Sequence, residues 1–500
     1  MDQKRLLKMQ TERGAKSESF ETAVKTIDTV INECRKKIEE QSTTYRDLNA
    51  IDKKAAIKLI IVEYVMTNQP LVKGFIDSEN RPDTLKLVDK LVEAITDYDI
   101  LTQAMMDEDI FEIRSNGKEI KVENRGHVED LRDKDGNILS WDSPEQQEIV
   151  LRKMLGDVRL TPKDALVNGS TIEGYRIAAV HSSATSLDPG DPSAPLYHSF
   201  VLRKFSKVRM GLPDIVAKHT MSDNMARLLA LLPAGGLTFL TVGPTASGKS
   251  TTNNAILKAV PPYLRTILIQ NPSEIDLRMK DASGRVINDV LHLEARDFEN
   301  PTPNDPTMAN EMNHILRLSP SLVCLGEIRS NEEFQLAMKI LSAGHPINST
   351  YHAASSEGAI SRFLTAYLAA SSEPSDLALR NITSLVDLII VQRIMRDGHR
   401  RVIQISEVEG VDPTNPNKAV LNDLYRFEIT DEPELDEAGN VKMIHGIHKR
   451  VGKMSQGLIE KLQLEGISSS RYNFLMDDVR KDEVETYTGK NIEHYGMVGF

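Results

Sequence analysis

The fold of this chain is decided by Gly243-Pro-Thr-Ala-Ser-Gly248-Lys249-Ser250, which matches the pattern GxxxxGK[ST]. Glycines in this pattern let the backbone curl so that its N–H groups face a phosphate, while Lys249 neutralises phosphate oxygens. The Ser250 hydroxyl can ligate Mg²⁺. The pattern predicts a site for ATP and Mg²⁺ made by Gly243, Thr245, Ala246, Ser247, Gly248, Lys249, Ser250 and Thr251.

Apolar segments on both sides of this loop predict the elements that hold it. Residues 236–242 are apolar and β-branched, as in a buried strand, and residues 251–260 predict a helix directly after the loop. Residues 320–327 predict a second strand, which ends in Glu327. A carboxylate at the end of a neighbouring strand can position the Mg²⁺ shell or orient the attacking water. The predicted fold class is therefore α/β, with a RecA-like P-loop ATPase core.

The chain before the core begins with helical patterns. Apolar residues three and four positions apart predict helices over residues 20–40, 55–62 and 85–95, which together form a small helical module. The apolar stripe of the first helix fits packing on its own domain. It also fits a surface helix that contacts a partner or another copy of the chain.

Alternating patterns then predict a β-rich segment. Residues 110–122 alternate around the turn Asn116-Gly117, which predicts a β-hairpin, and a second hairpin is predicted around Asp397-Gly398. Residues 185–195 are rich in Pro, Gly and Asp, which is typical of a surface loop. We expect five parts: an N-terminal helical extension (1–46), a helical module (47–109), an α+β domain (110–214), the ATPase domain (215–430) and a C-terminal tail (431–500).

Composition excludes several other classes of protein. A chain of 500 residues is too long for one core, and 40% hydrophobic with 27% charged residues is ordinary for a globular protein. The net charge of -12 argues against a nucleic-acid partner. Two cysteines, Cys34 and Cys324, cannot form a disulfide framework, and Cys324 lies in an apolar run that predicts burial. The polar N-terminus and the interrupted apolar stretch 228–242 predict a cytoplasmic protein whose membrane contact is peripheral.

Three motifs resemble the signature of the secretion and pilus-assembly ATPases. They are Gly326-Glu-Ile-Arg329, Ser342-Ala-Gly-His345 and Ser349-Thr-Tyr-His352-Ala. Residues 109–126 are similar to the N-terminal domain of that family, as are Gly174-Tyr-Arg-Ile177 and Leu202-Arg-Lys-Phe205. The resemblance covers roughly residues 50–465. Residues 382–390, 396–401, 405–410 and 446–467 are similar to the branch of tight-adherence pili and VirB-type secretion, with type IVb pilus and plasmid conjugation systems close behind.

This resemblance implies an assembly and a set of catalytic residues. It implies a homohexamer at the cytoplasmic membrane, in contact with an inner-membrane platform protein, with nucleotide held between the core and the N-terminal domain. Glu327 falls on the acid that helps to activate water, and His352 on the family's His box. Arg176 and Arg203 fall on N-terminal-domain arginines that approach the phosphates.

One motif departs from the family pattern. The family usually shows Glu-Asp-Pro-x-Glu, where this chain has Gln270-Asn271-Pro272-Ser273-Glu274, so only the last acid remains. Amides can hold a water by hydrogen bonds but cannot accept its proton at neutral pH. Either Glu274 and Glu327 suffice for hydrolysis, or turnover is slowed and the chain is a nucleotide-gated scaffold. A nucleic-acid translocase on the same core is a third alternative, disfavoured by the acidic charge.

Overall fold

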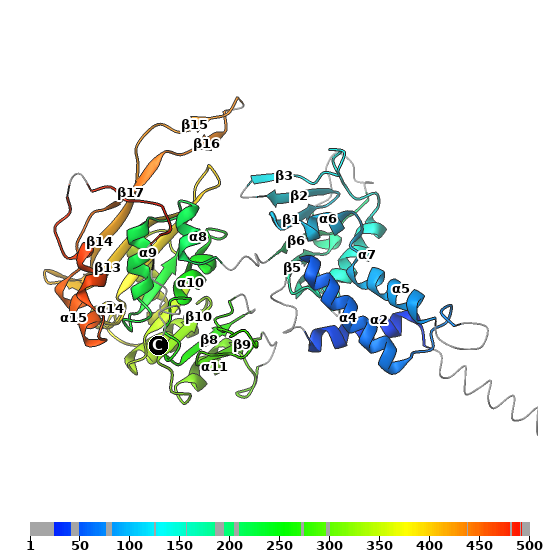
Figure 1. The fold of residues 1–500 in the computed structure, drawn as a ribbon, viewed down its shortest axis with the longest axis horizontal. Coiled ribbons are helices and arrows are strands. Elements are labelled where there is room, and N and C mark those ends of the chain that lie inside the picture. Colours follow the sequence, from blue (N-terminus) through cyan, green and yellow to red (C-terminus); the bar gives the residue numbers. More distant parts are fainter. Residues whose placement is uncertain are drawn as a thin grey trace, which may run out of the picture. The chain divides into compact units, whose positions relative to one another are not determined.

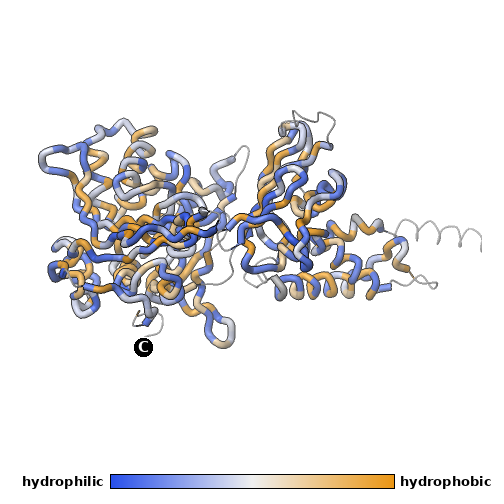
Figure 2. Tube along the Cα trace, turned by 90° about the horizontal axis from the view of Figure 1, so that it is seen from above, coloured by the Kyte–Doolittle hydropathy of each residue, from blue (hydrophilic) through white to orange (hydrophobic). Residues whose placement is uncertain are grey.

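The chain divides into two units, Met1–Val208 and Arg209–Phe500, each described here by itself (Figure 1). The computed structural model describes residues 25–41, 50–76, 83–124, 127–156, 158–185, 195–204, 210–271, 275–296, 301–437, 439–480, 483–490 and 492. Figure 2 shows apolar segments running through the interior of each unit. Within the described ranges, no helix combines the length and the apolar composition that crossing a bilayer requires.

The first unit begins with the predicted helical module. Its helices are α2 (Ile27–Glu40), α4 (Ala50–Asn68) and α5 (Thr84–Thr96). Val30, Cys34 and Ile38 lie four residues apart on α2, and all three are buried in a core shared with α4 and α5. The stripe on the first predicted helix therefore packs on its own unit, and the part of that prediction before Lys25 lies outside the described residues.

The second part of this unit is a six-stranded antiparallel sheet in the order β3-β2-β1-β6-β5-β4, counted over the described residues. One face packs with the helix α7 around Trp141, which is fully buried. The hairpin predicted at Asn116-Gly117 is confirmed, whereas most of the predicted loop 185–195 lies outside the described residues. The elements are η1 (Asp99–Leu101), α6 (Thr102–Met106), β1 (Ile110–Asn116), β2 (Glu119–Asn124), β3 (His127–Asp130), α7 (Pro144–Leu155), β4 (Leu166–Ser170), β5 (Arg176–Val180), η2 (Ser182–Ala184) and β6 (Ser199–Arg203).

The second unit is built on a nine-stranded sheet, counted over its described residues, in the order β17-β14-β13-β12-β7-β11-β10-β8-β9. The strands from β12 to β9 run parallel, and β13, β14 and β17 continue the sheet antiparallel. These strands are β7 (Phe239–Val242), β8 (Thr266–Gln270), β9 (Val290–Glu294), β10 (Leu322–Leu325), β11 (Ile347–Tyr351), β12 (Leu388–Ile394), β13 (Arg400–Asp412), β14 (Asn415–Ile429) and β17 (Gly446–Arg450).

Helices cover both faces of this sheet and bury its apolar side chains in two cores. On one face lie α8 (Leu212–Ala217), α9 (Asp223–Leu231), α10 (Lys249–Leu257) and α15 (Gln456–Leu464). The other face holds α11 (Met308–Ile315), α12 (Asn331–Ser342), α13 (Ser356–Leu368) and α14 (Ser375–Leu385). The predicted α/β class with a RecA-like core is confirmed, as are the hairpin at Asp397-Gly398 and the burial of Cys324.

Residues after 431 are built into this unit. The strand β17 extends the sheet, and Leu458, Leu462 and Leu475 are buried in the core of the α10 face. The Asp223 carboxylate on α9 accepts hydrogen bonds from the backbone N–H groups of Thr488 and Gly489. The segment that the sequence-based division sets apart as a tail thus contributes a strand and the helix α15 to the second unit. Its other elements are β15 (Glu434–Leu435), β16 (Val441–Met443), η3 (Ser469–Arg471) and η4 (Asn473–Leu475).

Candidate nucleotide-binding site

The loop between β7 and α10 has the backbone shape that its glycines allow. Gly248 has φ 90° and the neighbouring Ala246 has φ 61°, in the left-handed region that side chains disfavour. A Cβ added at Gly243 would lie 2.0 Å from the carbonyl oxygen of Gln392, so only glycine fits there. All eight residues predicted to bind ATP lie in this turn, at the N-terminus of α10, where the first backbone N–H groups lack helical partners.

The loop is held in place by hydrogen bonds to its own carbonyl oxygens. Lys249 Nζ donates to the oxygens of Gly243 at 3.0 Å and Pro244 at 2.9 Å. The Ser247 hydroxyl donates to Pro244 as well, at 2.8 Å. These bonds hold the ammonium group against the carbonyl oxygens at the start of the loop. The glycine shape, the buried lysine and the open helix end fit a nucleotide phosphate, and Ser250 is the hydroxyl available to Mg²⁺.

Neighbouring strands bring two more predicted site residues to this loop. The parallel strands β7, β11 and β10 are adjacent in the sheet, so their carboxyl ends share one edge. His352, directly after β11, places Nδ1 3.1 Å from the Gly243 oxygen and Nε2 3.2 Å from Oε1 of Glu327. Both ring nitrogens thus face oxygen atoms, one of the loop backbone and one of the acid. The histidine therefore connects the phosphate loop to the acid.

The second carboxylate oxygen of Glu327 is also occupied. Arg329 places Nε 2.8 Å and Nη2 2.7 Å from Oε2, while His352 faces Oε1. Both carboxylate oxygens of Glu327 are thus hydrogen-bonded or ion-paired. The side chain of Glu327 is 25% exposed. Arg329 ends one of the motifs that resemble the family signature, and that resemblance implied no role for it. Only its spacing, two residues after the acid at a strand end, could have indicated this contact.

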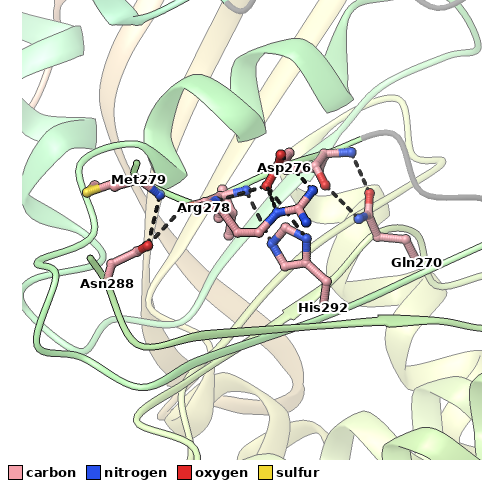
Figure 3. A network of polar contacts seen from close by, with 8 residues as sticks. Gln270, Asp276, Arg278, Met279, Asn288 and His292 are labelled. Carbon is pink, nitrogen blue, oxygen red and sulfur yellow. Dashed lines mark hydrogen bonds and ion pairs between the residues drawn. The ribbon is translucent and has the colours of Figure 1, made fainter. Parts of the chain in front are cut away.

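The end of β8 carries the departure from the family pattern, and its side chain serves the backbone. Gln270 is 2% exposed; its Nε2 donates to the carbonyl of Ile275 at 2.8 Å, and its Oε1 accepts from the Ile275 N–H at 2.6 Å (Figure 3). A glutamine can do both because it has a donor and an acceptor, whereas an ionised glutamate has acceptors only. Glu274, the acid that the sequence retains, lies outside the described residues.

A polar network fixes the chain that follows Gln270. Arg278 binds both carboxylate oxygens of Asp276, at 2.8 and 2.9 Å. The His292 Nε2 accepts from the N–H of Leu277, and the Asn288 Oδ1 accepts from the N–H of Met279 (Figure 3). Side chains therefore hold the backbone of the segment between β8 and β9. This network stabilises the backbone beside β9, the last strand of the sheet.

Two further acids lie beside the end of β8. Glu294 on β9 is the register partner of Gln270. Burial raises the pKa of Glu311 on α11 to about 7, and the charge of Glu294 adds to this shift. One Glu311 oxygen is buried and accepts no hydrogen bond among the described residues. Acids are thus present near this strand end, although the position itself holds an amide.

Arg176 and Arg203 lie in the other unit, and the structure brings them together there. They are directly opposite each other on β5 and β6, and Glu112 on β1 is the next partner of Arg203. All three side chains therefore point to the sheet face away from the core around Trp141. Arg203 is exposed on this face. The structure groups the two arginines with each other and groups Lys249, His352 and Glu327 within the second unit.

The parallel sheet, the strand inserted between β7 and β10, and the loop with its lysine define a RecA-like P-loop protein. The chain belongs to the family of type II/IV secretion system proteins, the secretion and pilus-assembly ATPases, whose model matches residues 99–431.

Individual relatives match shorter segments of the chain. It is 28% identical over 247 residues to an uncharacterised protein of Methanocaldococcus jannaschii, covering 49% of this chain and 40% of that protein. It is 34% identical over 192 residues to the type II secretion system ATPase E of Vibrio cholerae, covering 37% of this chain and 35% of that protein. The chain thus spans less than half the length of these two relatives. The solved structure of the Legionella pneumophila ATPase DotB is similar with a TM-score of 0.42 and 20% identity, over 59% of this chain and 75% of that chain.

Proposed function

We propose that this chain is an ATP-hydrolysing hexameric motor that powers the assembly of a pilus or of a type II or type IV secretion or conjugation machine. One observation carries the proposal. The carbonyl oxygen of Gly243 is shared between Lys249 and His352, and His352 reaches Glu327. The group that binds phosphate and the acid that can activate water are therefore joined through a single oxygen atom of the loop.

The residues divide the work of hydrolysis in a defined way. The loop N–H groups and Lys249 would hold the phosphates, and the Ser250 hydroxyl would hold Mg²⁺, which supplies positive charge to the phosphate oxygens. Glu327 orients the attacking water once one of its oxygens leaves His352 or Arg329. Release of that acid is then a step that nucleotide binding can control, because His352 also touches the loop.

The proposal is tested by phosphate release from Mg²⁺-ATP by the purified chain. We expect turnover of about 1 s⁻¹ or faster, near the low end of ordinary enzymes. Much slower turnover with nucleotide-dependent assembly would favour the second candidate, a weakly hydrolysing scaffold of the same machine. The observation that favours this candidate is at Gln270. An amide stands there in place of an acid, and both its polar atoms bind the backbone of Ile275.

Partners and location follow from the same proposal. A homohexamer on the inner face of the cytoplasmic membrane would contact a platform protein of the machine, closest in type to tight-adherence pili or VirB-type secretion. We expect no nucleic-acid partner, since the chain carries a net charge of -12. Phosphate release that rises on addition of single-stranded DNA would contradict this and favour a translocase.

A further inference from the structure

The phosphate loop has a second neighbour on the side away from Glu327. Val242 at the end of β7 is paired with Tyr351 of β11 and with Val391 of β12. The residues that follow those partners, His352 and Gln392, therefore flank Gly243 from opposite sides. His352 leads to the acid on β10, whereas Gln392 leads to β13.

Gln392 brings a buried amide to the loop. On the face of β12 that packs against α10, Leu388 and Ile390 are buried in the core, and Gln392 continues the same column at 2% exposure. The pairing of β12 with β13 shifts register between Val391 and Gln392, and the extra residue of this bulge lies on β13, so that β12 itself continues without interruption. The Gln392 Nε2 lies 3.0 Å from where a Cβ of Gly248 would stand. Its Oε1 is buried and has no hydrogen-bond donor among the described residues.

Arg400, at the start of β13, crosses the loop beside this amide. Its Nε donates to the carbonyl of Ala246 at 3.0 Å, and its Cδ lies 3.0 Å from the Cβ position of Gly248. Arg400 is paired with Ile394, two residues beyond Gln392, so both side chains share one face of the hairpin. The side chain is half-buried. A planar cation is thus fixed against the phosphate loop from the β12–β13 side.

The positions of His352 and Gln392 on opposite sides of the phosphate loop define the direction in which a nucleotide would lie. Its terminal phosphate must reach the side of Glu327 and His352, because the attacking water is activated there. The remainder of the nucleotide must then leave the loop on the opposite side. We infer that Arg400, supported by Gln392, forms the nucleoside side of the site and covers the sugar and the base of a nucleotide whose phosphates the loop holds. This inference rests on the proposed function, and it assigns the part of the ligand that the phosphate loop does not touch.

The chemistry of the two side chains suits this part of a nucleotide. A guanidinium group stacks on the face of an aromatic ring, and Arg400 is already oriented by its bond to Ala246, so little freedom is lost on binding. The unpaired Oε1 of Gln392 is an acceptor for a ribose hydroxyl or for a water that it binds.

The inference is tested with two probes that share phosphates but differ in the nucleoside: ADP and inorganic tripolyphosphate, each with Mg²⁺, titrated into the full chain by calorimetry. For Arg400→Ala we expect ADP affinity to fall about tenfold, as for loss of a stacked cation, and tripolyphosphate affinity to stay within about twofold. Arg400→Lys keeps the charge and loses the plane, so it should show the same selective loss.

A matched control and three outcomes separate the possibilities. Arg393→Ala removes an exposed arginine from the opposite face of the same hairpin and should bind both probes as wild type. A parallel loss of both probes in Arg400→Ala would mean that Arg400 only braces the loop, and unchanged affinities would remove it from the site. A wild-type chain that binds neither probe would overturn the proposed function together with this inference.

Discussion

The phosphate loop and the end of β8 lie on the same edge of one sheet, yet they use their polar side chains in opposite ways. In the loop, carbonyl oxygens bind the side chains of Lys249, Ser247 and Arg400, and the first backbone N–H groups of α10 have no partner within the helix. At the end of β8 the side chain of Gln270 binds the backbone of Ile275. In the loop, side chains hold the backbone in the shape that a phosphate group needs. At the end of β8, a side chain stabilises the backbone of the next segment.

This contrast shows why a motif position does not reveal its role by residue type alone. An amide at position 270 can be interpreted as a weakened catalytic group. The contacts of Gln270 show that both ends of the amide are engaged by one residue, Ile275, at 2.8 and 2.6 Å. Variants in the two regions should therefore fail differently, by lost chemistry in the loop and by lost stability at β8.

The largest effect is expected for Lys249→Ala. The variant should lose ATP turnover altogether and bind nucleotide more weakly, because the charge beside the phosphates is gone. Phosphate release and nucleotide titration would measure this, with the exposed Lys218→Ala as the matched control. Normal turnover in Lys249→Ala would remove the loop from the mechanism.

Glu327→Gln should keep nucleotide binding and lose turnover by a factor of about 10² or more, comparable to the loss of one preorganised catalytic group. The amide keeps the shape of the side chain but cannot accept a proton. Single-turnover phosphate release gives the measurement, and Glu332→Gln on the exposed start of α12 is the control. Unchanged release would assign the activation of water to another acid.

The variants Arg176→Ala and Arg203→Ala test whether catalysis needs residues outside the phosphate loop. The resemblance implies that these arginines reach the phosphates when the domains close, so we expect about a hundredfold lower turnover with affinity changed less than about tenfold, in line with other arginine fingers. Turnover and affinity are measured after confirming fold and oligomeric state. Arg152→Ala, which breaks only the exposed pair with Glu148, should resemble wild type.

Gln270→Glu should cost stability rather than raise activity. The carboxylate can accept from Ile275 N–H but has no N–H for the Ile275 carbonyl, and a buried unsatisfied group costs about 1 to 3 kcal/mol. Chemical unfolding of the chain, followed by a signal from the second unit, measures the loss of stability. If the double variant Gln270→Glu with Asn271→Asp hydrolyses ATP faster than wild type, the missing acids do limit the chemistry and the scaffold role of Gln270 is secondary.

The smallest effect concerns pH and the acids beside β8. Burial raises the pKa of Glu311 from 4.5 to about 7, so the folded chain binds a proton that the unfolded chain releases between these values. Stability contributed by this group is therefore present at low pH and falls as pH rises through that window. Thermal unfolding at pH 5 and pH 7.5 should show a smaller decrease for Glu311→Gln than for wild type. An identical decrease in both would mean that the acid is ionised in the folded state.

Much of the core could be predicted from local sequence, because its signals are local. The glycines and lysine of the phosphate loop, the apolar strands on either side and the turns at Asn116 and Asp397 each predict an element from a few neighbouring residues. Those predictions agree with β7, α10 and the two hairpins. The residues after 431 gave weaker signals, since β17 is stabilised by its pairing with β14 rather than by a pattern within its own residues.

The sequence by itself determined that this chain carries a phosphate loop in an α/β core and that an acid ends a nearby strand. Tertiary structure alone decided which side chains meet. The order of the strands placed His352 on one side of Gly243 and Gln392 on the other. The path of the chain after β8 brought Ile275 back to Gln270. The physical reason is that a strand pattern fixes which face a side chain occupies, whereas only the pairing of strands distant in sequence fixes its neighbours.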